Sequence, residues 1–209
     1  MKRLCVLWTY HSTAICFYIG AGLGASLTDN GENLNITKVL ETNETLWVYW
    51  ETTKHFYDVC TDTDCIQPKD TCDRNIKTGF SDKYYNYTRA MIEERSQYGT
   101  AYSGKFVEPY NIQYPPKSMV VTTIYGSPDP HLYTLEYTDD LTFNCSVFYI
   151  YSLNNRISKF ELETCEMLIT DSAVDYGPSE SCMTYFQRRC NGTKIYQPYK
   201  ADCKKHINK

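Results

Sequence analysis

The segment SMVVTTIYGSPDPHLYTLEYTDDLTFNCSVFYIY, residues 118–151, contains three strand patterns separated by two turns. Residues 118–125 and 141–151 are rich in β-branched and aromatic side chains, and residues 131–137 alternate between two sets of side chains, as strands do. Gly126-Ser127-Pro128-Asp129-Pro130 and Asp139-Asp140 are typical turn sequences. Short strands joined by tight turns predict an antiparallel arrangement.

The same pattern continues on both sides of this segment. Further strands are predicted at residues 46–53, 84–92, 105–110 and 160–170, and a cysteine-bearing loop at 57–75 leads into another strand. About eight short strands in this order favour an up-and-down barrel or a sandwich.

Two helices flank the predicted strands. Ile36, Val39 and Leu40 have helical spacing, which predicts a short helix at 34–42. A second helix is predicted from Ser179 to Cys190, because Pro178 suits a helix start and the apolar residues after it recur at helical intervals.

Residues 1–25 have the pattern of a secretion signal. Two basic residues open it, an uncharged and mostly apolar stretch runs to Leu23, and small residues close it. A membrane anchor is the alternative, because about 20 apolar residues can span a bilayer. The small residues favour cleavage between Ala21 and Ala25 instead. We therefore predict a mature chain of residues 26–209 that forms one domain and leaves the membrane.

Eight cysteines follow this leader, and an even number behind a secretion signal predicts four disulfides in an oxidising compartment. We therefore expect a secreted, extracellular protein. The eight are Cys60, Cys65, Cys72, Cys145, Cys165, Cys182, Cys190 and Cys203.

The charge and the sequons fit an extracellular binder. The formal charge is −4, or −6 without Lys2 and Arg3, so no nucleic-acid partner is expected. Five Asn-x-Ser/Thr sequons occur. Asn144 is the poorest, because it lies in a predicted strand beside a cysteine that we expect to be bridged. We predict glycosylation at Asn35, Asn43, Asn86 and Asn191.

Four stretches resemble the tick salivary lipocalins, a family that includes the histamine-binding proteins. They are ETLWVYWETT (44–53), TDD followed by NCSV (138–147), CEMLI (165–169) and the cysteine-bearing end (178–203). In order, they resemble the family's first strand, its cysteine-bearing strand after an acidic turn, its "CELLV" strand, and its closing helix with a terminal cysteine. The resemblance covers nearly all of the mature chain. It implies a mainly β fold, an eight-stranded antiparallel lipocalin barrel with a short N-terminal helix and one C-terminal helix, as a monomer.

The resemblance also implies disulfide partners. Matching positions pair Cys145 with Cys182, Cys72 with Cys203, and Cys165 with Cys190. Cys60 and Cys65 remain and could bridge each other. The sequence by itself leaves the connectivity open.

By resemblance, the function is capture of a small host mediator at a feeding site, which suppresses host defence. An eight-stranded barrel has room for one small ligand. The chain has 20 tyrosines, and aromatic faces attract cations, although a given tyrosine more often only fills a strand surface. Histamine or serotonin is the first candidate ligand, and we expect Trp50 and Tyr133 to contact it.

A buried amine also needs a carboxylate. In the amine-binding members an acid follows the barrel cysteine, where this chain has Ser146. Another acid begins a Glu-Leu-aromatic segment, which Glu166 matches although Leu168 replaces the aromatic residue. Glu41, before the first strand, is a further candidate contact.

Strand alternation leaves the orientation of Glu166 open. Adjacent residues face opposite sides of a strand, so Glu166 is inside only if Met167 is outside. For the first strand, we expect Glu51 to face solvent, because it would otherwise be a buried charge. This places Leu46, Val48 and Trp50 inside.

Other functions have weaker support. The chain has no His-Glu-x-x-His and no Gly-x-Ser-x-Gly motif, so we predict no enzyme and no catalytic residue, although a triad assembled in space stays open. A zinc site from His55, Cys60, Cys65 and Cys72 has poor spacing, so no metal or cofactor is predicted. Two alternatives remain. One is binding of a lipid, such as a leukotriene, fatty acid or sterol. The other is inhibition of a host immune or complement protein through the loop at 57–75.

Overall fold

The structure is a computed structural model of the chain. It describes residues 34–52, 59–60, 65–66, 71–93, 96–109, 114–126, 130–154, 163–190 and 194–207, without the side chains of residues 59, 60, 65, 66 and 93. The predicted signal peptide lies outside these residues. In the described part, no helix is both long enough and apolar enough to cross a membrane.

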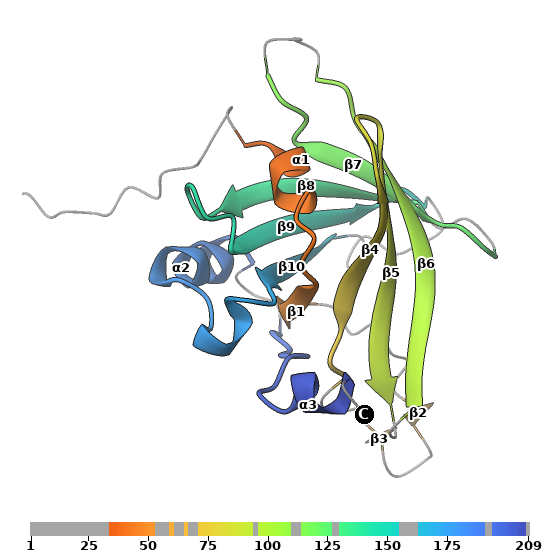
Figure 1. The fold of residues 1–209 in the computed structure, drawn as a ribbon, viewed down its shortest axis with the longest axis vertical. Coiled ribbons are helices and arrows are strands. Elements are labelled where there is room, and N and C mark those ends of the chain that lie inside the picture. Colours follow the sequence, from red (N-terminus) through yellow and green to blue (C-terminus); the bar gives the residue numbers. More distant parts are fainter. Residues whose placement is uncertain are drawn as a thin grey trace, which may run out of the picture.

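Eight antiparallel strands form a closed barrel (Figure 1). They are β1 (Leu46–Glu51), β4 (Arg74–Phe80), β5 (Tyr84–Glu93), β6 (Ser96–Phe106), β7 (Ser118–Thr123), β8 (His131–Thr138), β9 (Cys145–Ser152) and β10 (Glu163–Thr170). From β4 to β10 each strand pairs with the next, and β1 closes the barrel by pairing with β10 and β4. The predicted eight-stranded barrel is therefore confirmed. Two short strands, β2 (Val59–Cys60) and β3 (Cys65–Ile66), form a separate sheet.

The main differences from the predicted strand bounds are at the starts of β6 and β9. β6 begins at Ser96, not at residue 105, because it pairs with β5 along its whole length. That part of β6 contains two glycines and few β-branched residues, so pairing overrides its weak strand propensity. β9 begins at Cys145, because residues 141–144 belong to a turn in which Leu141 and Phe143 have positive φ angles of 69° and 54°.

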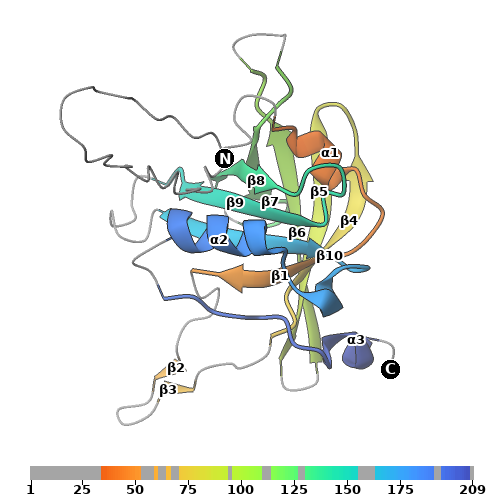
Figure 2. The same cartoon turned by 90° about the vertical axis from the view of Figure 1, so that its left-hand side faces the viewer.

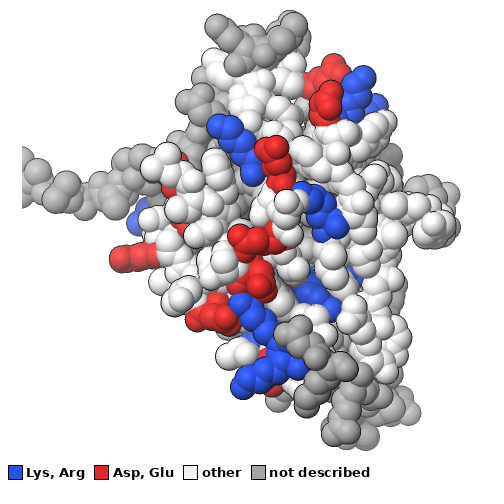
Figure 3. All heavy atoms as spheres, in the orientation of Figure 1, with Lys and Arg blue, Asp and Glu red and all other residues white. Residues whose placement is uncertain are grey.

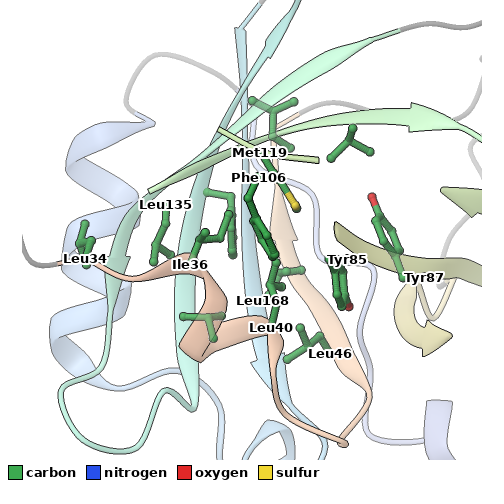
Figure 4. Packing of buried hydrophobic residues seen from close by; sticks show 14 of the residues in the cluster. Leu34, Ile36, Leu40, Leu46, Tyr85, Tyr87, Phe106, Met119, Leu135 and Leu168 are labelled. Atoms are coloured by element: carbon green, nitrogen blue, oxygen red, sulfur yellow. The ribbon is translucent and has the colours of Figure 1, made fainter. Parts of the chain in front are cut away.

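The short helix α1 (Ile36–Leu40) covers one end of the barrel. Asn35 caps it by accepting a hydrogen bond from the Thr37 backbone N–H at 3.0 Å. Its apolar residues are buried among residues that point into the barrel from the strands (Figure 4). This end of the barrel therefore has an apolar core that includes Leu46, Phe106, Met119, Leu135 and Leu168.

Helix α2 (Glu180–Arg189) lies on the outside of the barrel wall, across β9, β10 and β1 (Figure 2). The Ser179 side chain caps it by accepting from the Cys182 N–H at 3.1 Å. Phe186 is fully buried against the outward residues of these strands, which form a second core with Trp47, Val147, Met167 and Ile169. A further short helix, α3 (Cys203–Ile207), was not predicted.

Three disulfides connect this outer layer to the barrel. Cys145–Cys182 joins β9 to α2, and Cys165–Cys190 joins β10 to the residue that ends α2. Cys72–Cys203 joins the segment before β4 to α3. These are the pairs that the resemblance implies. Cys60 and Cys65 are opposite each other in the β2–β3 register, but their side chains lie outside the described ones, so their bridge stays a prediction.

The predicted glycosylation sites have different surroundings. Asn43 is exposed, Asn86 is partly buried in β5, and Asn35 is the cap of α1. Asn191 lies outside the described residues. On the face drawn in Figure 3, acidic and basic side chains of the described residues are interspersed, so this face has no extended basic patch.

Candidate ligand-binding site in the barrel

The interior of the barrel changes from apolar to charged along its axis. Near α1 the inward residues are the apolar ones of the first core, including Leu46 and Val48 of β1. Farther along β1 and its neighbours the inward side chains are charged or carry hydroxyls. The charged ones are Glu51, Asp73, Arg89 and Glu166.

A β-bulge in β1 reverses the expected orientation of its end. Val48 pairs with Leu168 but Trp50 pairs with Met167, so Tyr49 is the extra residue. Trp50 therefore faces outward, where its ring lies 5.6 Å from that of Phe186, and Glu51 faces inward and is only 6% exposed. The prediction that Trp50 is inside and Glu51 outside is wrong, because simple alternation does not hold across a bulge.

Glu51, Asp73 and Glu166 surround Arg89, whose side chain enters the barrel from β5. The Arg89 Nη1 lies 2.6 Å from Glu166 Oε1, and its Nη2 lies 3.1 Å from Glu51 Oε2 and 3.2 Å from Asp73 Oδ2. All four residues are buried. Glu166 thus faces the interior and Met167 packs outside, which settles the orientation that the sequence left open.

The cluster is stable only as a unit. Burial by itself would lower the pKa of Arg89, but Glu166, Asp73 and Glu51 together raise it well above its usual value. Removing Arg89 would leave three buried carboxylates without their shared cation, which is strongly destabilising. With three carboxylates and one guanidinium, the cluster carries a formal excess of two negative charges.

Aromatic residues lie beside these charges. Tyr85, Tyr87 and Tyr102 are stacked, with ring centroids 5.1 Å and 5.3 Å apart. Tyr133, on β8, is partly buried, and its hydroxyl interacts with Tyr87 and lies near Glu166. Desolvation first, and then neighbouring groups that include Glu166, raise the pKa values of Tyr87 and Tyr133, so both hydroxyls are neutral donors at pH 7.

The structure does not place the other predicted acid in this interior. Glu41 is exposed at the end of α1, and its backbone carbonyl accepts a hydrogen bond from Lys77 Nζ at 2.6 Å. Ser146, which stands where amine-binding members have an acid, is buried, and its hydroxyl lies 2.8 Å from the Thr138 hydroxyl. Of the predicted ligand contacts, only Glu166 and Tyr133 lie together.

Sequence reasoning missed Arg89, Asp73 and Glu51 as interior residues. One signal was available for Arg89, because alternation places it on the same strand face as Tyr85 and Tyr87. If that face is buried, a charged residue on it needs a buried partner of opposite charge. Asp73 had no such signal, because it lies in a segment that reads as a loop.

The zinc alternative is wrong for Cys72, which is bonded to Cys203. His55 lies outside the described residues. Within the described part of the chain, no group of three His, Cys, Asp or Glu side chains is arranged to hold a metal ion.

A family model described as tick histamine binding protein matches residues 25–205. Among solved structures, the chain resembles one described as the crystal structure of an AM182 serotonin complex, with a TM-score of 0.54 and 13% identity over 83% of this chain and 94% of that chain. A biogenic amine-binding protein, solved as a selenomethionine derivative, gives a TM-score of 0.41 and 8% identity over 85% and 94%. No curated protein matches the sequence. The first structure shares the fold.

Proposed function

Because the chain belongs to the tick histamine-binding protein family, we propose that it captures a small biogenic amine, histamine or serotonin, inside its barrel. That family consists of lipocalin-like ligand binders, so the prediction that the chain is not an enzyme is confirmed. In this proposal the protein is secreted in saliva, and it acts stoichiometrically by lowering the concentration of free amine.

The observation that carries the proposal is the buried Glu166 carboxylate within a negatively charged interior. Glu166 is 1% exposed and lies beside Arg89 and two further carboxylates. An ammonium ligand would reduce the formal excess of negative charge, which is costly in a medium of low dielectric constant. The faces of the stacked tyrosines would attract the same cation.

A lipid with a carboxylate head fits this interior less well. Such a head would need a cation inside the barrel. Within the described residues Arg89 is the cation placed there, and three carboxylates already contact it. An anionic head would meet a net negative charge there, so the charge balance favours the amine. The alternative of a host-protein inhibitor relied on the loop at 57–75, most of which lies outside the described residues.

Calorimetric titration of the secreted protein with histamine and with serotonin tests the proposal. Glu166→Gln should weaken amine binding by about 1.5–3 kcal/mol, the range for hydrogen bonds to charged groups. Glu163→Gln is the matched control, because Glu163 lies on the same strand but is exposed. Binding of a fluorescent fatty acid but of neither amine would replace this proposal with the lipid function.

A further inference from the structure

Two buried acceptor atoms, one just before β4 and one at its start, have no donor among the described residues. Asp73 and Asn75 are 0% and 4% exposed, and within the described residues their Oδ1 atoms have no hydrogen-bond partner. Buried polar atoms are nearly always paired, and an unpaired one costs about 1–3 kcal/mol. The two unpaired Oδ1 atoms therefore indicate that a bound molecule supplies their hydrogen-bond donors.

Both side chains belong to the charged part of the barrel. Asn75 is directly opposite Arg89 in the β4–β5 register, so the two side chains share a face. Asp73, two residues earlier, contacts Arg89 Nη2 through Oδ2, which leaves its Oδ1 available on the same inner surface. Neither residue was predicted from the sequence.

The backbone around Asp73 is held on both sides. The Asp73 carbonyl accepts from the Val48 N–H at 2.9 Å, and the N–H of Cys72 donates to the Pro198 carbonyl at 3.1 Å. Cys72 has a φ of +50° and is bonded to Cys203. These contacts fix the carboxylate before any ligand arrives, and fixed groups bind with a smaller entropy cost.

We propose that Asp73 and Asn75 form the subsite for the ligand's ammonium group and make the protein selective for primary amines. This rests on the proposed amine-binding function and deepens it. A primary ammonium has three N–H donors, which can satisfy both Oδ1 atoms and place a positive charge beside Asp73. A dimethylated ammonium has one donor, so at least one buried acceptor stays unpaired. A site built to hydrogen-bond a group strongly rejects the analogue that lacks it.

The test is calorimetry with two pairs of probes, histamine and Nα,Nα-dimethylhistamine, and serotonin and N,N-dimethylserotonin. Wild type should bind the primary amine of each pair at least about 10-fold more tightly, the lower end for a hydrogen bond to a charged group. Asp73→Asn should weaken primary-amine binding by roughly 10–100-fold. Asn75→Leu leaves every charge in place and should bring the selectivity ratio close to one.

Two matched controls separate this effect from a general loss of structure. Asn86 also has a buried Oδ1 without a partner among the described residues, but it alternates with inward-facing Tyr85 and Tyr87, so Asn86→Leu should keep the selectivity. Asp175→Asn removes an exposed carboxylate and should leave both affinities unchanged. If wild type binds no amine, the proposed function fails. If it binds amines but Asn75→Leu keeps the full preference for primary ones, ordered water satisfies these acceptors and only the present inference is overturned.

Discussion

The inner and outer faces of β1 and β10 illustrate two different uses of the same strands. Outward, Trp47, Met167 and Ile169 join a close-packed apolar core beneath α2, and two disulfides cross it. Inward, Glu51 and Glu166 hold Arg89. Apolar burial and disulfides stabilise a fold reliably, whereas a buried charge cluster is weak support for stability. The contrast indicates that the outer layer stabilises the barrel, whereas the charged interior contributes little stability and is the part that we propose for binding.

The largest expected effect comes from the Cys72–Cys203 disulfide, which attaches α3 to the segment just before β4. It closes a loop with a sequence separation of 131 residues. In the chain-entropy model, replacing both cysteines by alanine should lower the free energy of unfolding by about 5 kcal/mol. The Cys165–Cys190 pair spans 25 residues, so its removal should cost about 3.5 kcal/mol. Urea unfolding measures both, and the reverse order would contradict this ranking.

Phe186→Ala tests whether the outer layer serves stability without serving binding. Phe186 lies on the buried face of α2, and truncating such a side chain costs about 3–5 kcal/mol. Amine affinity, measured well below the unfolding temperature, should stay within about twofold of wild type. A large loss of affinity in a folded Phe186→Ala protein would show that the two faces are coupled.

Strand patterns and turn residues made the antiparallel strands predictable, and the resemblance to the tick salivary lipocalins favoured a barrel over a sandwich. The orientation of side chains in β1 was not predictable. Alternation predicts the faces of Leu46 and Val48 correctly, but one extra residue at Tyr49 exchanges the faces of Trp50 and Glu51. No single residue type marks such a bulge, since its position depends on pairing with β10.

The charged site was predictable only in part, for a related reason. Glu166 could be identified by resemblance, but its partners come from β1, β5 and the segment before β4, which are far apart in the sequence. The rule that charges stay outside also misled the prediction for Glu51. Its burial depends on Arg89, 38 residues away, and sequence periodicity carries no information about such a partner.

Trp50→Phe sharpens the comparison at the bulge. Because Trp50 packs on Phe186 outside the wall and is only partly buried, replacing it by the smaller phenylalanine should cost about 0.5–3 kcal/mol of stability, the usual range for a single substitution. Amine affinity should stay within about twofold, as calorimetry can measure. Tyr133→Phe is the interior counterpart and should weaken binding, because it removes a hydroxyl near Glu166. If Trp50→Phe weakened amine binding as much as Tyr133→Phe does, Trp50 would contact the ligand after all.

The smallest expected effect concerns a surface ion pair in the outer layer. Lys204 Nζ of α3 lies 2.8 Å from Asp175 Oδ2, and both side chains are partly exposed. Hydrogen bonds from Lys204 and Tyr199 hold the pKa of Asp175 below its ordinary value of 3.8. A lowered carboxyl pKa stabilises the folded state above the ordinary value, and this contribution is lost as the pH falls through the folded-state pKa. Asp175→Asn should therefore cost less than about 1 kcal/mol at pH 7.

High salt and low pH should each remove the small difference in stability between wild type and Asp175→Asn. In 1 M NaCl the Debye length is about 3 Å, so an exposed pair is largely screened, and in acid Asp175 becomes neutral like the asparagine that replaces it. The interior pair of Arg89 and Glu166 is buried, so the stability change caused by Glu166→Gln should hardly respond to salt. Urea unfolding of both variants at low and high salt makes the comparison. An Asp175→Asn effect that persisted in 1 M NaCl would mean that this contact behaves like the buried cluster, and the distinction between the two regions would have to be redrawn.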